Sequence, residues 1–146
     1  MSKRKKVFIG IIVLLILLQL VPTEKNQSAE VPATDFVKSL QPPEEISILL
    51  HNACYDCHSN HTDYPWYSKV QPFGLLLQSH IRGAKQELNF SEFAAYPEHE
   101  QKHLLEHMVE HIEDGTMPMR SYRWMHPEAR WSEAEKRAVV EWVRGI

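Results

Sequence analysis

The chain has 146 residues, which suits one domain with a short appendage. Its sixteen Lys and Arg residues face nineteen Asp and Glu residues, and four of the basic residues lie at positions 3–6. The remainder of the chain is therefore clearly acidic, which argues against nucleic-acid binding because that function needs a basic face. An acidic surface is compatible with docking to a basic protein partner.

The first elements are a basic flank over residues 1–6 and an apolar run over residues 7–21, VFIGIIVLLILLQLV. This pairing is typical of an export signal, with the basic end kept in the cytoplasm. We expect an uncleaved signal anchor that inserts as a single transmembrane helix, because the residues after Val21 make a poor cleavage site. A cleaved signal peptide is the alternative. The remainder is then expected on the periplasmic side of a bacterial inner membrane, or soluble in the periplasm after cleavage.

Residues 22–43 are polar and contain four prolines, so we expect a linker there and a folded domain over residues 44–146. Helical spacing of apolar residues predicts a helix from Glu44 into position 58, a second that starts at Pro72, and a third over about 98–113. A capping box of Ser132 and Glu135 predicts a fourth helix near the C-terminus. No segment alternates with a period of two residues. The predicted class is all-α, a small domain of about four helices.

The two cysteines of the chain lie in the motif Cys54-Tyr55-Asp56-Cys57-His58. Residues three apart share one helix face, so both sulfurs can reach one edge of a porphyrin while His58 lies beneath its iron. C-x-x-C-H is the sequence sign of covalent haem attachment. A zinc site, a dithiol redox pair and a transient disulfide are alternatives for the same residues.

A methionine follows in the loop Asp114-Gly115-Thr116-Met117-Pro118. A thioether is a soft, neutral ligand that suits haem iron and raises its reduction potential. Met117 is therefore the predicted distal ligand opposite His58, with Met119 and Met125 as rivals. The alternative is a methionine that only fills a gap in the core.

Together these motifs resemble a class I cytochrome c. The stretches CYDCHSNHTDYPWY, HIRGAKQELNFSEF and TMPMRSYRWMHPEARWSEAE are more narrowly similar to the bacterial haem-binding domain family. The resemblance spans roughly residues 44–143 and implies one covalently attached haem c, His58 as proximal ligand and Met117 as distal ligand. The chain departs from ordinary class I cytochromes by lacking a glycine directly after His58 and by the long insert at 59–71.

Side chains around the motif also suggest roles. Trp66 and Tyr67 of the aromatic insert are candidates to pack on the haem, with a plain core role as the alternative. A backbone carbonyl in a proline-flanked segment, near Pro65 or Pro72, is a candidate partner for the second ring nitrogen of His58. Arg82 is a candidate partner for a haem propionate or else a solvated surface residue.

Four histidines recur every fourth residue at positions 99, 103, 107 and 111. On a helix they share one face, so His103, His107 and His111 form a candidate divalent-metal site. The alternative is a solvated face of an acidic helix.

We expect a one-electron carrier and not an enzyme, because His58 and Met117 would fill both axial positions of the iron. The expected partners are redox proteins and the cytochrome c maturation machinery. The alternatives are a haem-based sensor or peroxidase-like protein with an open iron site, and a metal-binding module that uses the histidine stripe.

Overall fold

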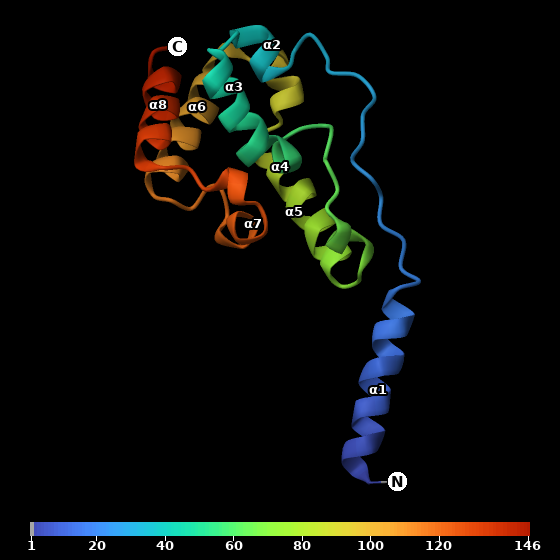
Figure 1. Cartoon of the computed structure of the whole chain (residues 1–146). Helices are drawn as coiled ribbons and strands as arrows, with labels where there is room; N and C mark the ends of the chain where they lie inside the picture. Colours follow the sequence, from blue (N-terminus) through green and yellow to red (C-terminus); the bar gives the residue numbers. More distant parts are fainter. Residues whose placement is uncertain (1) are drawn as a thin grey trace.

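The computed structural model describes residues 2–146, so Met1 of the expected basic flank lies outside it (Figure 1). Every regular element in that range is helical. The extended segments contribute one isolated antiparallel bridge, between Gln27 and His61. The all-α prediction is confirmed.

The apolar run near the N-terminus forms helix α1 (Lys3–Leu18), which has 16 residues, none of them buried. In Figure 1 this helix stands apart from the other helices. Between residues 2 and 146, no helix has both the length and the apolar character needed to cross a membrane. The expected transmembrane anchor is therefore unsupported: 16 residues rise by about 24 Å, whereas the hydrocarbon core of a bilayer is about 30 Å thick.

The segment expected to be a linker packs against the domain. The Asn26 amide donates to the Ser59 carbonyl at 2.8 Å and to the Thr62 hydroxyl at 2.9 Å. Farther along, the Asp35 carboxylate caps helix α2 (Phe36–Leu40), and the Phe36 side chain is fully buried. The folded unit therefore includes residues well before the expected boundary at residue 44.

The predicted helices appear close to their expected positions. The segment predicted to run from residue 44 to residue 58 is built from α3 (Glu44–Leu50), a π-helical turn (His51–Tyr55) and α4 (Asp56–His58). It is followed by α5 (Phe73–Glu87), α6 (Glu98–Glu113) and α8 (Glu133–Arg144), and both halves of the predicted capping box are formed at Ser132 and Glu135.

Several short elements are additional to the four predicted helices. They are α2, α7 (Arg120–Met125) and the 3-10 turns Trp66–Lys69, Phe90–Ala95 and Pro127–Ala129. Each is six residues or shorter, too short for a helical period to show in the sequence.

An aromatic cluster around Phe36 holds the core together. The Phe36 ring lies 4.8 Å from that of Phe90 and 4.7 Å from that of Phe93, measured between centroids. Helix α8 lies against α6 and α3, and α4 lies against α5. In Figure 1, α4 and α5 are on one side and α6, α7 and α8 on the other. This arrangement places the cysteine motif on one side of the domain and the methionine loop on the other.

Candidate functional site

A cavity of about 590 Å³ opens where these two groups of helices face each other. Its size lies within the range typical of small-molecule and cofactor sites. The predicted ligands Cys54, Cys57, His58 and Met117 all line it. Residues that are 63 positions apart in sequence are thus brought to one site by the packing of separate helices.

Both cysteine thiols are free and half-buried. Burial raises the pKa of the Cys54 thiol to about 12, with a smaller contribution from the nearby Cys57. Burial likewise raises the pKa of Cys57 to about 11, helped by the Asp56 carboxylate. Both groups are therefore protonated thiols at neutral pH, and they face the cavity from the same helical segment.

The His58 side chain is held in one orientation by a backbone carbonyl. Its Nδ1 atom lies 3.0 Å from the Leu88 carbonyl oxygen. A carbonyl can only accept, so Nδ1 carries the proton and the Nε2 lone pair is left free. Burial lowers the pKa of His58, opposed in part by the bond to the Leu88 backbone, so the ring is neutral near pH 7. The expected carbonyl near Pro65 or Pro72 is replaced by one that directly follows α5.

The loop after α6 presents two thioethers to the cavity. Gly115 takes a left-handed conformation, with φ of 68°, which glycine adopts without strain. The chain then turns back so that the Met117 N–H donates to the His111 carbonyl at 3.0 Å. Met117 and Met119 both line the cavity, whereas Met125 does not and is 40% exposed on α7. Met125 is thereby set aside as a rival ligand.

The histidine stripe borders the same cavity. His103, His107 and His111 are lining residues, and His99 is not. Across residues 2–146, no three or more His, Cys, Asp or Glu side chains are grouped as a metal site would require. The stripe therefore does not form a separate metal site in this conformation. It lines one wall of the site that also contains His58.

The aromatic insert over residues 59–71 does not line this cavity. Trp66 is 74% exposed, and neither Trp66 nor Tyr67 lines the cavity. The Tyr67 hydroxyl lies 3.2 Å from Nε2 of His126, so it links the insert to the residue that follows α7. The expected packing of these two rings on a haem is not supported by this arrangement.

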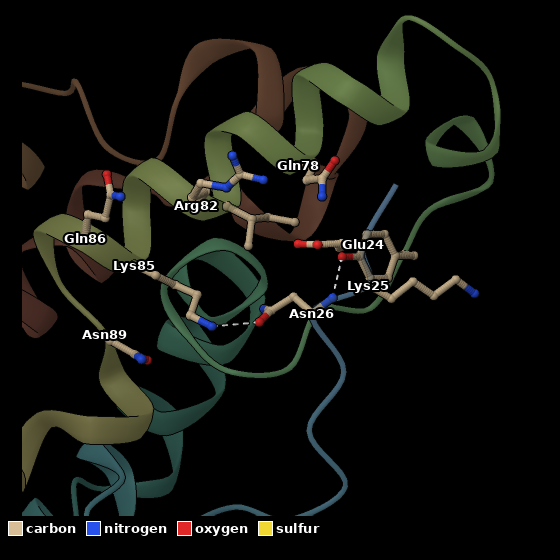
Figure 2. Close-up of a pocket in the computed structure, with 10 residues that line it drawn as sticks. Glu24, Lys25, Asn26, Gln78, Arg82, Lys85, Gln86 and Asn89 are labelled. Carbon is tan, nitrogen blue, oxygen red and sulfur yellow. Dashed lines mark hydrogen bonds between the residues drawn. The ribbon is translucent and has the colours of Figure 1, made fainter. Parts of the chain in front are cut away.

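Arg82 lines a different, smaller cavity of about 320 Å³, between α5 and the segment around Asn26 (Figure 2). There the Lys85 ammonium donates to the Asn26 side-chain oxygen at 2.8 Å, and the Asn26 N–H donates to the Tyr64 hydroxyl at 2.8 Å. The expected role of Arg82 at a propionate of a cofactor in the larger cavity is therefore not supported.

Asp56 and Tyr122 were not predicted as part of the site. The Tyr122 hydroxyl donates to the Asp56 carboxylate at 2.7 Å, and the Tyr122 ring lines the cavity. Burial raises the Tyr122 pKa, with a further contribution from the Asp56 charge. This hydrogen bond connects the cysteine motif to α7, and its two residues are 66 positions apart in sequence. No local sequence pattern predicts it.

The sequence model of the haem-binding domain family matches residues 13–145. The chain belongs to the haem-binding domain family. Neither a curated protein nor a solved structure matches it. The family assignment confirms the expectation of a haem cofactor.

The cavity residues fit a haem in three respects. Imidazole and thioether groups, both ligands of haem iron, face the same cavity. A Cβ atom added at Gly83 on α5 would have no neighbour within 4 Å, so this lining residue leaves open space where a side chain would project. The buried Trp131 Nε1 atom has no hydrogen-bond partner within residues 2–146, and its ring lines the cavity. A haem carboxylate would supply the acceptor that this N–H lacks.

Proposed function

We propose that the protein is a one-electron carrier that holds a single haem c through thioether bonds to Cys54 and Cys57. His58 and Met117 are the proposed axial ligands. The observation that carries this proposal is the shared cavity, which brings two free thiols, a correctly oriented imidazole and a thioether to one site.

The chemistry of attachment suits the two thiols. Each S–H group would add across one vinyl group of a haem, with the sulfur bonded to one carbon and the hydrogen to the neighbouring carbon, so that no oxidant would be needed. The thiols must be reduced and unpaired for this addition, and both are free here. A haem bound at the site supplies an iron that cycles between ferrous and ferric states.

The residues of the chain have distinct tasks in this proposal. The Leu88 carbonyl fixes the tautomer and orientation of His58, as partners of ligating histidines generally do. Phe90, whose ring centroid lies 5.9 Å from that of His58, packs beside the imidazole and limits access of water. The Gly115 turn places the thioether of Met117 at the cavity.

We further propose that the domain works in the periplasm. The basic flank followed by an apolar helix favours export, and haem c assembly by the cytochrome c maturation machinery takes place on that side. The acidic charge beyond residue 6 favours redox partners with a basic docking face.

The proposal is tested by co-expression with a cytochrome c maturation system, followed by a denaturing gel stained for haem. The wild-type chain is expected to stain. The single variants Cys54→Ala and Cys57→Ala should stain weakly, and the double variant should not stain. A chain that loses its haem on the gel, but carries haem in its native state, would show that attachment is not covalent.

Carbon monoxide distinguishes an electron carrier from a haem sensor or peroxidase-like protein. A ferrous iron with both axial positions filled binds carbon monoxide poorly, because a protein ligand must first leave. Slow and incomplete binding is expected. Rapid, stoichiometric binding would favour the sensor or peroxidase-like alternative and would argue against electron transfer as the function.

A further inference from the structure

The end of α6 brings a second potential iron ligand to the position where Met117 enters the cavity. The backbone N–H of Met117 donates to the carbonyl of His111 at 3.0 Å, and both side chains line the cavity. We propose that His111 competes with Met117 for the iron, so that the protein has two coordination states, His58/Met117 and His58/His111. This inference rests on the proposed function.

Hydrogen bonds around His111 determine which ring nitrogen carries a proton. The Thr116 hydroxyl donates to the His111 carbonyl at 3.2 Å. Its oxygen also lies 2.9 Å from Nδ1 of the same histidine. When the hydroxyl proton is given to the carbonyl, the oxygen accepts from Nδ1. In that tautomer the Nε2 atom of His111 is unprotonated, with a lone pair available for a metal.

His58 and His111 thus have similar hydrogen bonding at the ring, although they lie on two different elements. Each has its Nδ1 atom within hydrogen-bond distance of an oxygen, the Leu88 carbonyl for His58 and the Thr116 hydroxyl for His111. Metal-ligating histidines typically donate their second ring nitrogen in this way. One of the two residues belongs to the C-x-x-C-H motif, and the other lies on α6, so they approach the cavity from separate helices.

In the described part of the chain, the other two lining histidines of the stripe lack such a hydrogen bond at the ring. His103 and His107 line the cavity, and their rings lie 4.2 Å apart between centroids. In the chain from residue 2 onward, no hydrogen bond fixes the tautomer of either ring. Of the three lining histidines of the stripe, His111 combines a hydrogen-bonded Nδ1 atom with a direct contact to the Met117 backbone.

Exchange of a thioether for an imidazole changes the redox properties of the iron. A thioether favours the ferrous state, so methionine ligation raises the reduction potential relative to bis-histidine ligation. The His58/His111 state is therefore the lower-potential form. Occupancy of the two states would set the potential at which the carrier accepts an electron.

The competition is tested with the covalently loaded Met117→Leu variant, which keeps the bulk of the side chain without its sulfur. Its ferric haem is expected to stay low-spin and six-coordinate, with the near-infrared magnetic circular dichroism of a bis-imidazole iron and a lower reduction potential than wild type. The double variant Met117→Leu/His111→Ala should lose that band and become high-spin. The matched control, Met117→Leu/His99→Ala, removes a histidine of the same helix that does not line the cavity and should behave as Met117→Leu alone.

Two further variants test the role of Thr116. In the Met117→Leu background, Thr116→Val should weaken bis-imidazole ligation, whereas Thr116→Ser, which keeps the hydroxyl, should preserve it. The proposal is overturned if Met117→Leu is high-spin or carries no haem, or if the double variant with His111→Ala keeps the bis-imidazole band. A wild-type chain without covalent haem would instead refute the proposed function, together with this inference.

Discussion

At the scale of single residues, the Trp131 indole is the most informative side chain at the cavity. Its buried N–H has no partner within residues 2–146, and an unsatisfied buried donor destabilises a fold by about 1–3 kcal/mol. A haem carboxylate in the cavity would remove that penalty. The same substitution should therefore act differently on the apoprotein and on the haem-loaded protein.

Trp131→Phe removes the N–H and keeps an aromatic ring. The smaller ring costs packing in both forms, because Trp131 belongs to the buried core. The free energy of unfolding should fall by about 1 kcal/mol more in the haem-loaded protein, which loses a hydrogen bond, than in the apoprotein, which loses an unpaired donor. Urea unfolding of both forms measures the difference, with Trp66→Phe at an exposed site as control. Equal effects on the two forms would mean that Trp131 does not contact the cofactor.

The two thiols give a prediction about pH. Their pKa values in the folded apoprotein, about 12 for Cys54 and about 11 for Cys57, lie above the ordinary value of 9.0. A raised thiol pKa stabilises the fold below the ordinary pKa, and this stabilisation is lost as the pH rises through the folded values. The stability of the apoprotein should therefore decline between about pH 9 and 12.

The Cys54→Ala/Cys57→Ala variant isolates the contribution of the two thiols, because every other titratable group is kept. Its decline in unfolding free energy over this interval should be smaller than that of the wild-type apoprotein, as measured by urea unfolding at fixed pH values. Identical pH profiles would show that the thiols are not buried as described.

The sequence predicted which residues line the site better than it predicted the residues that contact them. Local motifs mark the four predicted ligands, and all of them line one cavity: Cys54, Cys57, His58 and Met117. Leu88 contributes only its backbone carbonyl, and Tyr122 acts through a contact 66 residues away, so no local pattern marks either residue. Residue type alone made Trp66 and Tyr67 candidates to pack on a haem. Whether a side chain reaches the cavity depends on the tertiary fold, and Trp66 is exposed.

At the scale of elements, α5 lines the cavity with a residue that has no side chain. Gly83 lines the cavity, and an added Cβ atom would meet nothing within 4 Å. Glycine in a helix is less favourable than alanine by about 0.5–1 kcal/mol, so its presence here has a local cost. Space for the cofactor explains why the helix tolerates it.

Gly83→Leu should therefore separate folding from cofactor loading. The apoprotein should gain about 0.5–1 kcal/mol in unfolding free energy from better helix propensity. Haem staining should fall several-fold, because the side chain projects into the cavity. Gln86→Leu, on the same helix but lining the smaller cavity, is the control and should load haem normally. Normal staining of Gly83→Leu would place the haem elsewhere.

Helix boundaries were predicted best where a cap or a long apolar period marked them. The Ser132–Glu135 capping box and the length of α6 show this clearly. The π-helical turn His51–Tyr55 was not foreseen, because its residues continue an ordinary helical pattern. Such turns are common at functional sites, and this one contains Cys54, the first cysteine of the motif.

At the scale of the whole molecule, helix α1 lies outside the core, and its C-cap Gln19 is hydrogen-bonded to Gln71 of the domain. No residue of α1 is buried, whereas Asp35 and Phe36 are embedded in the core. Proline and polar residues suggested a linker over 22–43 from composition alone, whereas the hydrogen bonds of Asn26 depend on a loop that is distant in sequence.

Removal of residues 1–18, with a cleavable export signal in their place, should leave the haem-loaded domain intact. The free energy of unfolding is expected to change by less than about 0.5 kcal/mol, as for surface changes generally. A parallel truncation of residues 1–36 removes the buried Phe36 and should strongly destabilise the domain. If the shorter truncation proved equally damaging, α1 would have to be part of the folded unit.

The central claim is that one haem is bonded to the sulfurs of Cys54 and Cys57 above the His58 imidazole. Mass spectrometry of a proteolytic digest, from protein matured with a cytochrome c assembly system, tests it most directly. The peptide that spans residues 54–58 is expected to carry the mass of one complete haem, with neither thiol open to alkylation. A peptide of unmodified mass, with both cysteines alkylated or joined in a disulfide, would contradict the claim.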